Sequence, residues 1–147
     1  EDTMITRETD YAIRALLRLA QQGDGHVVST TVLAEDMEIP YRFLRRIVLK
    51  LGARALVQSS RGKQGGLRLA RPADTVTLLD IVEAMDPESI TLNICLGDGH
   101  DCPRSERCVV HYELAEIQQE LRTRLAIITL ATLVARDRER ITLFQTA

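Results

Sequence analysis

The chain has 147 residues, of which 45% are hydrophobic and only 3% are aromatic, and it contains no Trp. This length suits one compact domain with an appendage, and the aliphatic composition favours packed helices over an all-β sandwich. The formal net charge of −2 gives no global sign of nucleic-acid binding, and because we find neither a secretory leader nor an apolar run of roughly 18 residues, we expect a cytoplasmic protein without a membrane partner.

The first part of the chain predicts a helix-turn-helix motif. Apolar residues at helical spacing predict a helix over residues 9–21, which a glycine-rich turn ends. A second helix begins near Ser29 or Thr30, which are favourable N-caps, and Pro40 suits the first turn of a third helix over residues 41–54. Two short helices joined by a tight turn, the second rich in arginine, are typical of DNA-binding proteins.

The segment after the third predicted helix indicates a β-hairpin with a basic tip. Two short runs that favour strands, residues 56–60 and 67–70, flank the sequence Arg-Gly-Lys-Gln-Gly-Gly. From Arg42 to Arg71 the chain carries Lys and Arg but no Asp or Glu, which gives this region a local positive charge. The order of two helices and a basic hairpin predicts a winged helix-turn-helix domain that binds double-stranded DNA.

The basic side chains of the third helix and of the hairpin tip are the predicted DNA contacts. Arginines near the start of a recognition helix can reach guanine edges or pair with phosphates. A thin basic loop suits a narrow minor groove. The alternative is a solvated basic face beside a turn. The candidate DNA-binding residues are Tyr41, Arg42, Arg45, Arg46, Arg61 and Lys63.

Three cysteines follow a helix predicted over residues 77–85 and lie in or beside an irregular segment at 93–107. They are separated from one another and from His111 by six, five and two residues, in the order Cys95, Cys102, Cys108 and His111. Thiolates are the preferred ligands of iron–sulfur clusters, and imidazole can replace thiolate. A zinc site, although no Cys-x2-Cys pair is present, and three free thiols are the alternatives. The pattern predicts an iron–sulfur cluster on the three cysteines.

Two residues compete to be the fourth ligand of that cluster. His111 lies one helical turn after Cys108, so it reaches the metal without further ordering of the chain. Asp10, at the N-terminus of the first helix, is a harder and less usual ligand, and an acid there also favours the helix dipole. We expect His111 to be the fourth ligand, with Asp10 as the alternative.

The last third of the chain predicts a long helix that begins near residue 106. Its apolar stripe is longer than a winged domain of about 80 residues can cover. A symmetric dimer suits a reader of paired DNA half-sites, so we expect a homodimer through this stripe. Its interface residues are Leu114, Ile117, Leu121, Leu125 and Ile128.

These elements predict a mainly α fold with a small β-hairpin wing. We expect a winged helix-turn-helix domain over residues 1–86. The rest, residues 87–147, holds the cysteine loop, the long dimerisation helix and a short terminal helix over residues 129–140. No catalytic triad, phosphate loop or pair of carboxylates is evident, so the sequence does not predict an enzyme.

Two stretches resemble the Rrf2 family of bacterial regulators: ITRETDYAIR at residues 5–14 and SRGKQGGLRL at residues 60–69. With the cysteines and the long helix, the resemblance covers residues 4–133. It implies a winged-helix dimer whose long helices cross and a cluster on the three cysteines. His111 resembles the arrangement of IscR-type members, which hold a [2Fe–2S] cluster. Asp10 matches the aspartate that NsrR-type members lend across the dimer to a [4Fe–4S] cluster.

The chain also departs from IscR-type members. The gap between its first two cysteines lies between those of the IscR and RirA types, and Arg45 stands where IscR-type members have an acidic residue. We therefore expect a dimeric transcriptional regulator that senses redox state, iron or nitric oxide through a cluster, [2Fe–2S] in preference to [4Fe–4S]. The alternatives are a cluster-free regulator that acts through a protein partner and a zinc or thiol redox protein.

Overall fold

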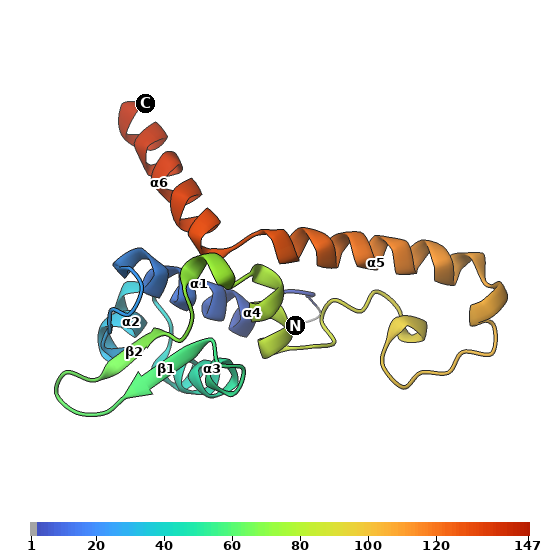
Figure 1. Cartoon of the computed structure of the whole chain (residues 1–147), viewed down its shortest axis with the longest axis horizontal. Coiled ribbons are helices and arrows are strands. Elements are labelled where there is room, and N and C mark those ends of the chain that lie inside the picture. Colours follow the sequence, from blue (N-terminus) through green and yellow to red (C-terminus); the bar gives the residue numbers. More distant parts are fainter. Residues whose placement is uncertain (1–2) are drawn as a thin grey trace.

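The computed structural model describes residues 3–147 and confirms the predicted fold class, mainly α with a small β-hairpin (Figure 1). The DNA-binding part consists of α1 (Arg7–Gln22), α2 (Thr30–Asp36), α3 (Tyr41–Ala53), β1 (Val57–Ser60), β2 (Gly66–Leu69) and α4 (Leu78–Met85). Two long helices complete the chain, α5 (Val109–Ile127) and α6 (Leu130–Thr146). Within the described residues, no helix combines the length and apolar character that crossing a bilayer requires.

Side-chain caps explain where several helices begin. The hydroxyl of Thr6 accepts a hydrogen bond from the amide of Thr9 at 3.2 Å, so α1 begins two residues before the predicted position. Ser29 caps α2 in the same way. Thr77 and Asp80 form a reciprocal capping box at the start of α4.

The two C-terminal helices differ from their predicted bounds. Cys108 has an extended backbone after a 3-10 turn at Ser105–Arg107, so α5 begins at Val109 rather than near residue 106. Helix α6 runs to Thr146, six residues beyond the predicted end of the terminal helix. Periodicity alone rarely fixes such boundaries, because a helix ends where capping and packing permit.

The hydrophobic core lies between α1, α2, α3, α4 and the hairpin. Its largest fully buried side chains are Leu16, Leu19, Leu33, Leu44, Ile47, Leu51, Leu56 and Ile81. In the hairpin, Val57 pairs with Leu69 and Ser60 with Gly66 in antiparallel register. Val28, between α1 and α2, adds a bridge to Leu67, so the hairpin is fixed to the helical body.

The start of α6 belongs to the same core. Leu130 is fully buried, and its amide donates to the carbonyl of Val76 at 2.9 Å. The amide of Leu78 similarly donates to the carbonyl of Ile128 at 2.9 Å. The division of the chain at residue 86 stays a prediction, but residues 128–130 pack on the part that precedes it.

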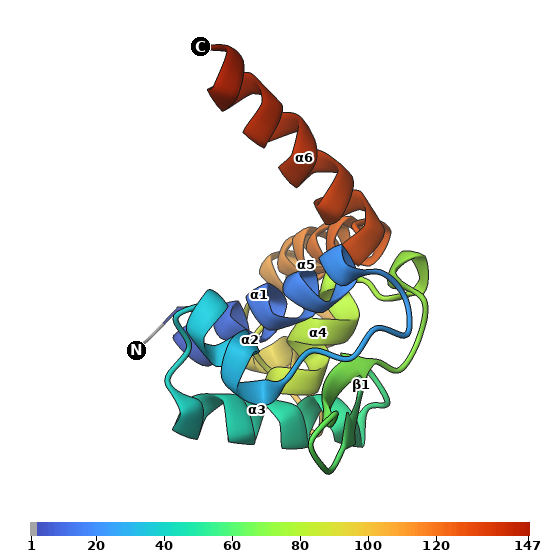
Figure 2. The ribbon, with the colours of Figure 1, turned by 90° about the vertical axis from the view of Figure 1, so that its left-hand side faces the viewer.

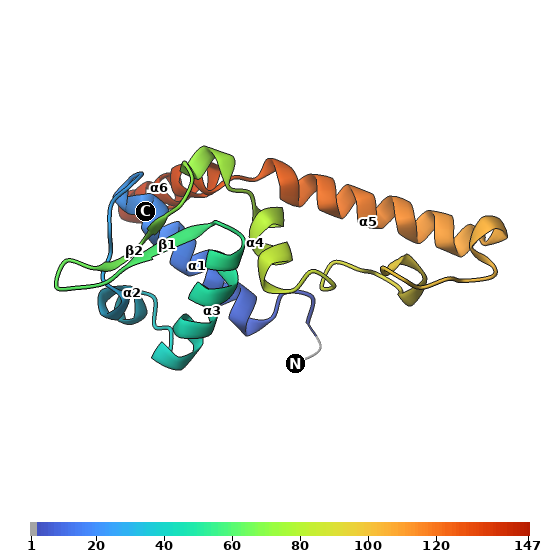
Figure 3. The same ribbon diagram turned by 60° about the horizontal axis from the view of Figure 1, so that its bottom comes forward.

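Helix α5 and the cysteine loop form an arm on one side of the domain, and the hairpin tip projects from the opposite side (Figures 1 and 3). Figure 2 shows α3 and the hairpin along one edge of the domain, with α6 rising from the other. None of the residues of α5 is buried. The arm therefore keeps much of its apolar surface exposed in a single chain.

Candidate functional site

Helix α3 separates its apolar residues from its basic ones. Leu44, Ile47 and Leu51 are buried at helical spacing and fix one face of the helix to the core. The predicted DNA-binding residues Tyr41, Arg42, Arg45 and Arg46 are all exposed on the remaining surface. Because the apolar face of α3 is buried against the core, the four polar side chains point to solvent.

The exposed surface of α3 has two edges. On the edge beside the hairpin, Tyr41 and Arg45 line a groove of about 420 Å³ together with Ser59 and Arg61. The structure therefore brings together one predicted contact from the hairpin and two from α3. The exposed Lys63 lies farther along the hairpin tip and does not line this groove.

On the edge of α3 that faces α1, Phe43 lies between two arginines. The guanidinium carbon atoms of Arg42 and Arg46 are 5.0 and 5.1 Å from the centre of its ring, within range of cation–π attraction. The ring of Tyr11 approaches Phe43 from α1 with a centroid distance of 5.9 Å. Glu8, also on α1, pairs with Arg46 at 3.3 Å. The sequence pattern did not indicate that Phe43 and Glu8 lie beside the arginines of α3.

The glycines of the hairpin allow close backbone contacts. A Cβ on Gly65 would lie 2.4 Å from the carbonyl oxygen of Ser60, and one on Gly66 would lie 2.1 Å from that of Val28. Gly62 has a φ of +103° and meets no atom within 4 Å, so it serves the turn itself. From the sequence, we expected only that this thin basic loop suits a narrow DNA groove. For Gly65 and Gly66, the structure adds a reason internal to the fold.

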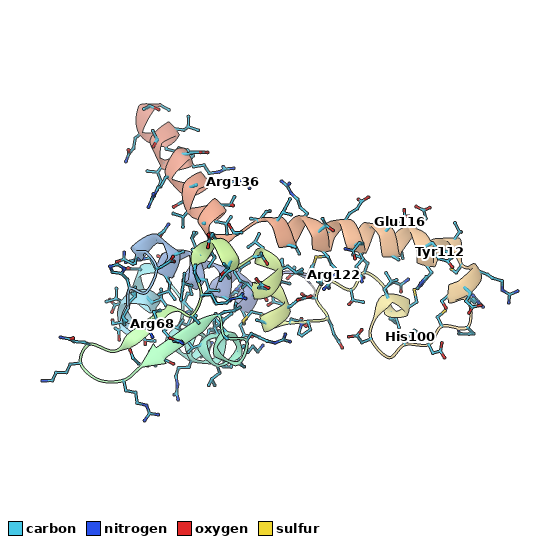
Figure 4. All side chains as sticks on the ribbon, viewed as in Figure 1. Arg68, His100, Tyr112, Glu116, Arg122 and Arg136 are labelled. Carbon is cyan, nitrogen blue, oxygen red and sulfur yellow. The ribbon has the colours of Figure 1, made fainter. Side chains whose placement is uncertain are left out.

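The three cysteines lie in the loop between α4 and α5, and each is half-buried. Cys95 is in a 3-10 turn at Ile94–Leu96, and Cys108 directly precedes α5. Nδ1 of His111 is 3.4 Å from Sγ of Cys95, so residues 16 positions apart meet at the far end of the arm. Figure 4 shows this end, where Tyr112 on α5 lies above His100 of the loop.

The predicted metal ligands are only partly assembled. Within residues 3–147, no three His, Cys, Asp or Glu side chains are grouped as ligands of a single ion. Asp10 instead pairs with Arg14 on the next turn of α1 at 2.8 Å. The ligand set therefore stays a prediction, with Cys95 and His111 as the pair that the fold brings together.

Most of the predicted interface stripe is half-buried within the single chain. Leu114, Leu121, Leu125 and Ile128 are half-buried, and only Ile117 is classed as exposed, at 52%. On the covered side, the amide of Leu92 donates to Gln118 at 2.9 Å. Arg122 reaches from α5 to Glu83 of α4, and its position beside the domain is visible in Figure 4. Further apolar residues of α5 are exposed: Val109, Val110, Tyr112 and Ile127.

Residues 5–136 match the sequence pattern of the family described as "Rrf2: Iron-dependent Transcriptional regulator". The chain belongs to the Rrf2 family. It is a DNA-binding transcriptional regulator and not an enzyme, in agreement with its fold and with the function of its relatives.

Two relatives carry the name of HTH-type transcriptional regulators. ORF2 of Azotobacter vinelandii is 32% identical over 133 residues, which cover 90% of this chain and 80% of that protein. Rv1287 of Mycobacterium tuberculosis is 38% identical over 95 residues, which cover 64% of this chain and 59% of that protein. The second match thus spans less than two thirds of the mycobacterial relative.

Solved structures of the family share the fold. IscR of T. potens superposes with a TM-score of 0.74 at 24% identity, covering 92% of this chain and 89% of that one. CymR, the global cysteine regulator of B. subtilis, gives a TM-score of 0.71 at 20% identity, covering 90% and 96%. These likenesses confirm the winged-helix fold.

Proposed function

We propose that this regulator senses redox state, iron or nitric oxide through an iron–sulfur cluster held by Cys95, Cys102 and Cys108, with His111 as the fourth ligand. The observation that carries the proposal is the contact between Cys95 and His111 at the end of the arm. When bound, the cluster would supply chemistry that responds to electrons, iron supply or nitric oxide.

The donor set fits such a group. Three thiols and an imidazole are soft or borderline ligands, which suit iron–sulfur clusters and not hard cations. Sγ of Cys95 and Nδ1 of His111 are 3.4 Å apart, so both atoms could bind the same cluster.

The loop that carries the other two cysteines can adapt to a ligand. Its backbone hydrogen bonds in residues 96–107 are local turns, such as the bond from the amide of Ser105 to the carbonyl of Cys102. One further bond joins the hydroxyl of Tyr112 to the carbonyl of Glu106. Because few contacts oppose a rearrangement, Cys102 and Cys108 can move towards Cys95 at small cost.

The choice of His111 over Asp10 is also supported by local contacts. His111 already touches a cysteine, whereas Asp10 forms an ion pair with Arg14 that ligation would have to displace. We therefore favour a [2Fe–2S] cluster with His111, and the alternative is a [4Fe–4S] cluster with Asp10 from the second subunit.

We propose that the DNA contacts come from α3 and the hairpin tip, namely Tyr41, Arg42, Arg45, Arg46, Arg61 and Lys63. Two observations support this assignment. All six side chains are exposed, and Arg45 of α3 and Arg61 of the hairpin line the same groove. Arginine can pair with base edges or phosphates, and a basic hairpin can follow the neighbouring minor groove.

We also propose a homodimer through the arm, with the predicted stripe at its centre. The support is that α5 leaves large apolar side chains in contact with solvent, which a second copy would cover. Ile117 is the most exposed member of the predicted stripe. A two-fold dimer would present two α3 helices to paired half-sites.

A route from the cysteine loop to the DNA-binding face supports regulation by the cluster. The loop begins after α4 and ends at α5, and α4 packs against both α1 and α3. A change in loop conformation would therefore shift α4 against the recognition helix and α5 against the second subunit. Either movement would alter how well the two domains fit paired half-sites.

The ligand assignment is tested by comparing His111→Ala with Asp10→Ala, both purified without oxygen. Iron and sulfide content and the visible spectrum report the cluster. We expect His111→Ala to alter the spectrum and Asp10→Ala to retain it. The opposite result would favour Asp10 and a [4Fe–4S] cluster, whereas DNA binding that survives replacement of all three cysteines by Ala would favour a cluster-free regulator.

A further inference from the structure

The carboxylate of Glu8 lies beside two cations of the recognition helix. Its Oε1 atom is 3.3 Å from Nε of Arg46, and its Oε2 atom is 3.6 Å from Nζ of Lys50. The side chain of Glu8 is 21% exposed and that of Arg46 is 61% exposed, so the acid is the more buried partner. One acid on α1 thus reaches two successive turns of α3.

Neighbouring groups hold both cations near this acid. Arg46 also packs over the ring of Phe43 at 5.1 Å, and Nζ of Lys50 donates to the carbonyl oxygen of Met85 at 3.1 Å. These contacts reduce the freedom of each side chain to turn towards another anion. The two cations are therefore already positioned beside Glu8.

The other two arginines on the exposed surface of α3 have no such competitor. Across residues 3–147, neither Arg42 nor Arg45 forms an ion pair. Helix α3 therefore carries two arginines without an ion-pair partner among the described residues and two cations whose charge Glu8 partly neutralises.

We propose that Glu8 determines the specificity of DNA binding by limiting the affinity for DNA of arbitrary sequence. Non-specific affinity grows with the number of phosphates that Lys and Arg neutralise. A carboxylate fixed beside Arg46 and Lys50 lowers that number and repels the phosphate backbone, while base contacts made by other residues are retained. Specificity then rises because the competing complexes are weakened. This inference rests on the proposed contact between Arg46 and DNA.

The test compares Glu8→Gln with Asp36→Asn in the full chain. Asp36 pairs with Arg18 at 2.8 Å between α1 and α2, so its variant changes net charge equally without releasing a cation of α3. Fluorescence anisotropy measures binding to a random-sequence duplex between 50 and 200 mM salt. The logarithm of the association constant falls linearly with the logarithm of the salt concentration, and each phosphate contact adds about 0.9 to the steepness of that line. For Glu8→Gln we expect the line to be steeper by about 1–2, because one or two further phosphate contacts form.

Between 50 and 200 mM salt, the affinity of Glu8→Gln should therefore fall by a factor that is about 3 to 12 times larger than the factor for the wild type. Asp36→Asn should keep the wild-type slope. In an Arg46→Gln background, replacing Glu8 should have a smaller effect. Glu8→Asp, which keeps the charge but shortens the side chain, should have an intermediate slope, and it provides a second variant if Glu8→Gln lowers stability in urea.

The outcomes separate this inference from the proposed DNA contacts. If Arg46→Gln in the Glu8→Gln background leaves affinity and slope unchanged, the assignment of Arg46 to the DNA interface fails. If Arg46→Gln weakens binding in that background but both single Glu8 variants have the slope of Asp36→Asn, the role of Glu8 is overturned.

Discussion

Replacing Gly66 by Ala tests how the hairpin is attached to the domain. The new Cβ would lie 2.1 Å from the carbonyl oxygen of Val28, which is closer than real Cβ contacts allow. Val28 and Leu67 exchange two backbone hydrogen bonds of 2.8 Å at this point. Relief of the collision therefore requires the segment around Val28 to move away from β2 and to lose these bonds.

The expected cost follows from these contacts. Overpacking costs about 1–3 kcal/mol, and the two hydrogen bonds contribute about 0.5–1.5 kcal/mol each. The free energy of unfolding should therefore fall by about 2–6 kcal/mol, in addition to any backbone strain. Since small domains are stable by about 5–15 kcal/mol, this loss is large enough to measure in urea by far-UV circular dichroism.

Gly62→Ala is the matched control in the same hairpin. Gly62 has a φ of +103°, but a Cβ there would meet no atom within 4 Å, so its replacement adds only backbone strain. Gly66→Ala should be the more destabilising variant by about 2 kcal/mol or more. Equal losses in the two variants would refute the explanation by close contact with Val28.

Three further variants test the DNA-binding face and the arm. Arg61→Ala should weaken operator binding by about 1–3 kcal/mol if the arginine enters a groove, as measured by anisotropy; unchanged binding would remove it from the interface. Ile117→Glu should yield monomers in light scattering, because a dimer would bury the new charge, whereas the exposed Gln119→Glu should not; a stable Ile117→Glu dimer would exclude that part of α5. Leu130→Ala should lower stability by about 2–5 kcal/mol in urea; a negligible loss would contradict its place in the core.

Much of the DNA-binding fold could be predicted because its signals are local. Helical spacing places Leu44, Ile47 and Leu51 on one face of α3, and Ser29 indicates the start of α2. The glycines and basic residues after β1 mark the hairpin tip. These features depend on neighbours a few residues apart, which a single sequence shows directly.

The remaining features depend on contacts between distant parts of the chain. The pairing of Glu8 with Arg46 requires α1 to pack beside α3, and burial of Leu130 requires α6 to return to the core. The cysteine spacing predicted that the three cysteines bind one cluster, but it did not show that Cys95 contacts His111. Tertiary packing decides such contacts, and no local pattern records them.

The cluster itself is tested most directly by purifying the protein without oxygen and measuring iron, acid-labile sulfide and the visible spectrum. We expect a coloured protein with equal amounts of iron and sulfide, two of each per subunit if the cluster is [2Fe–2S] and four if it is [4Fe–4S]. Removal of the iron should then change the affinity for DNA that the protein selects from a random pool. A colourless protein that contains zinc or no metal, and binds that DNA unchanged after chelation, would contradict the proposal.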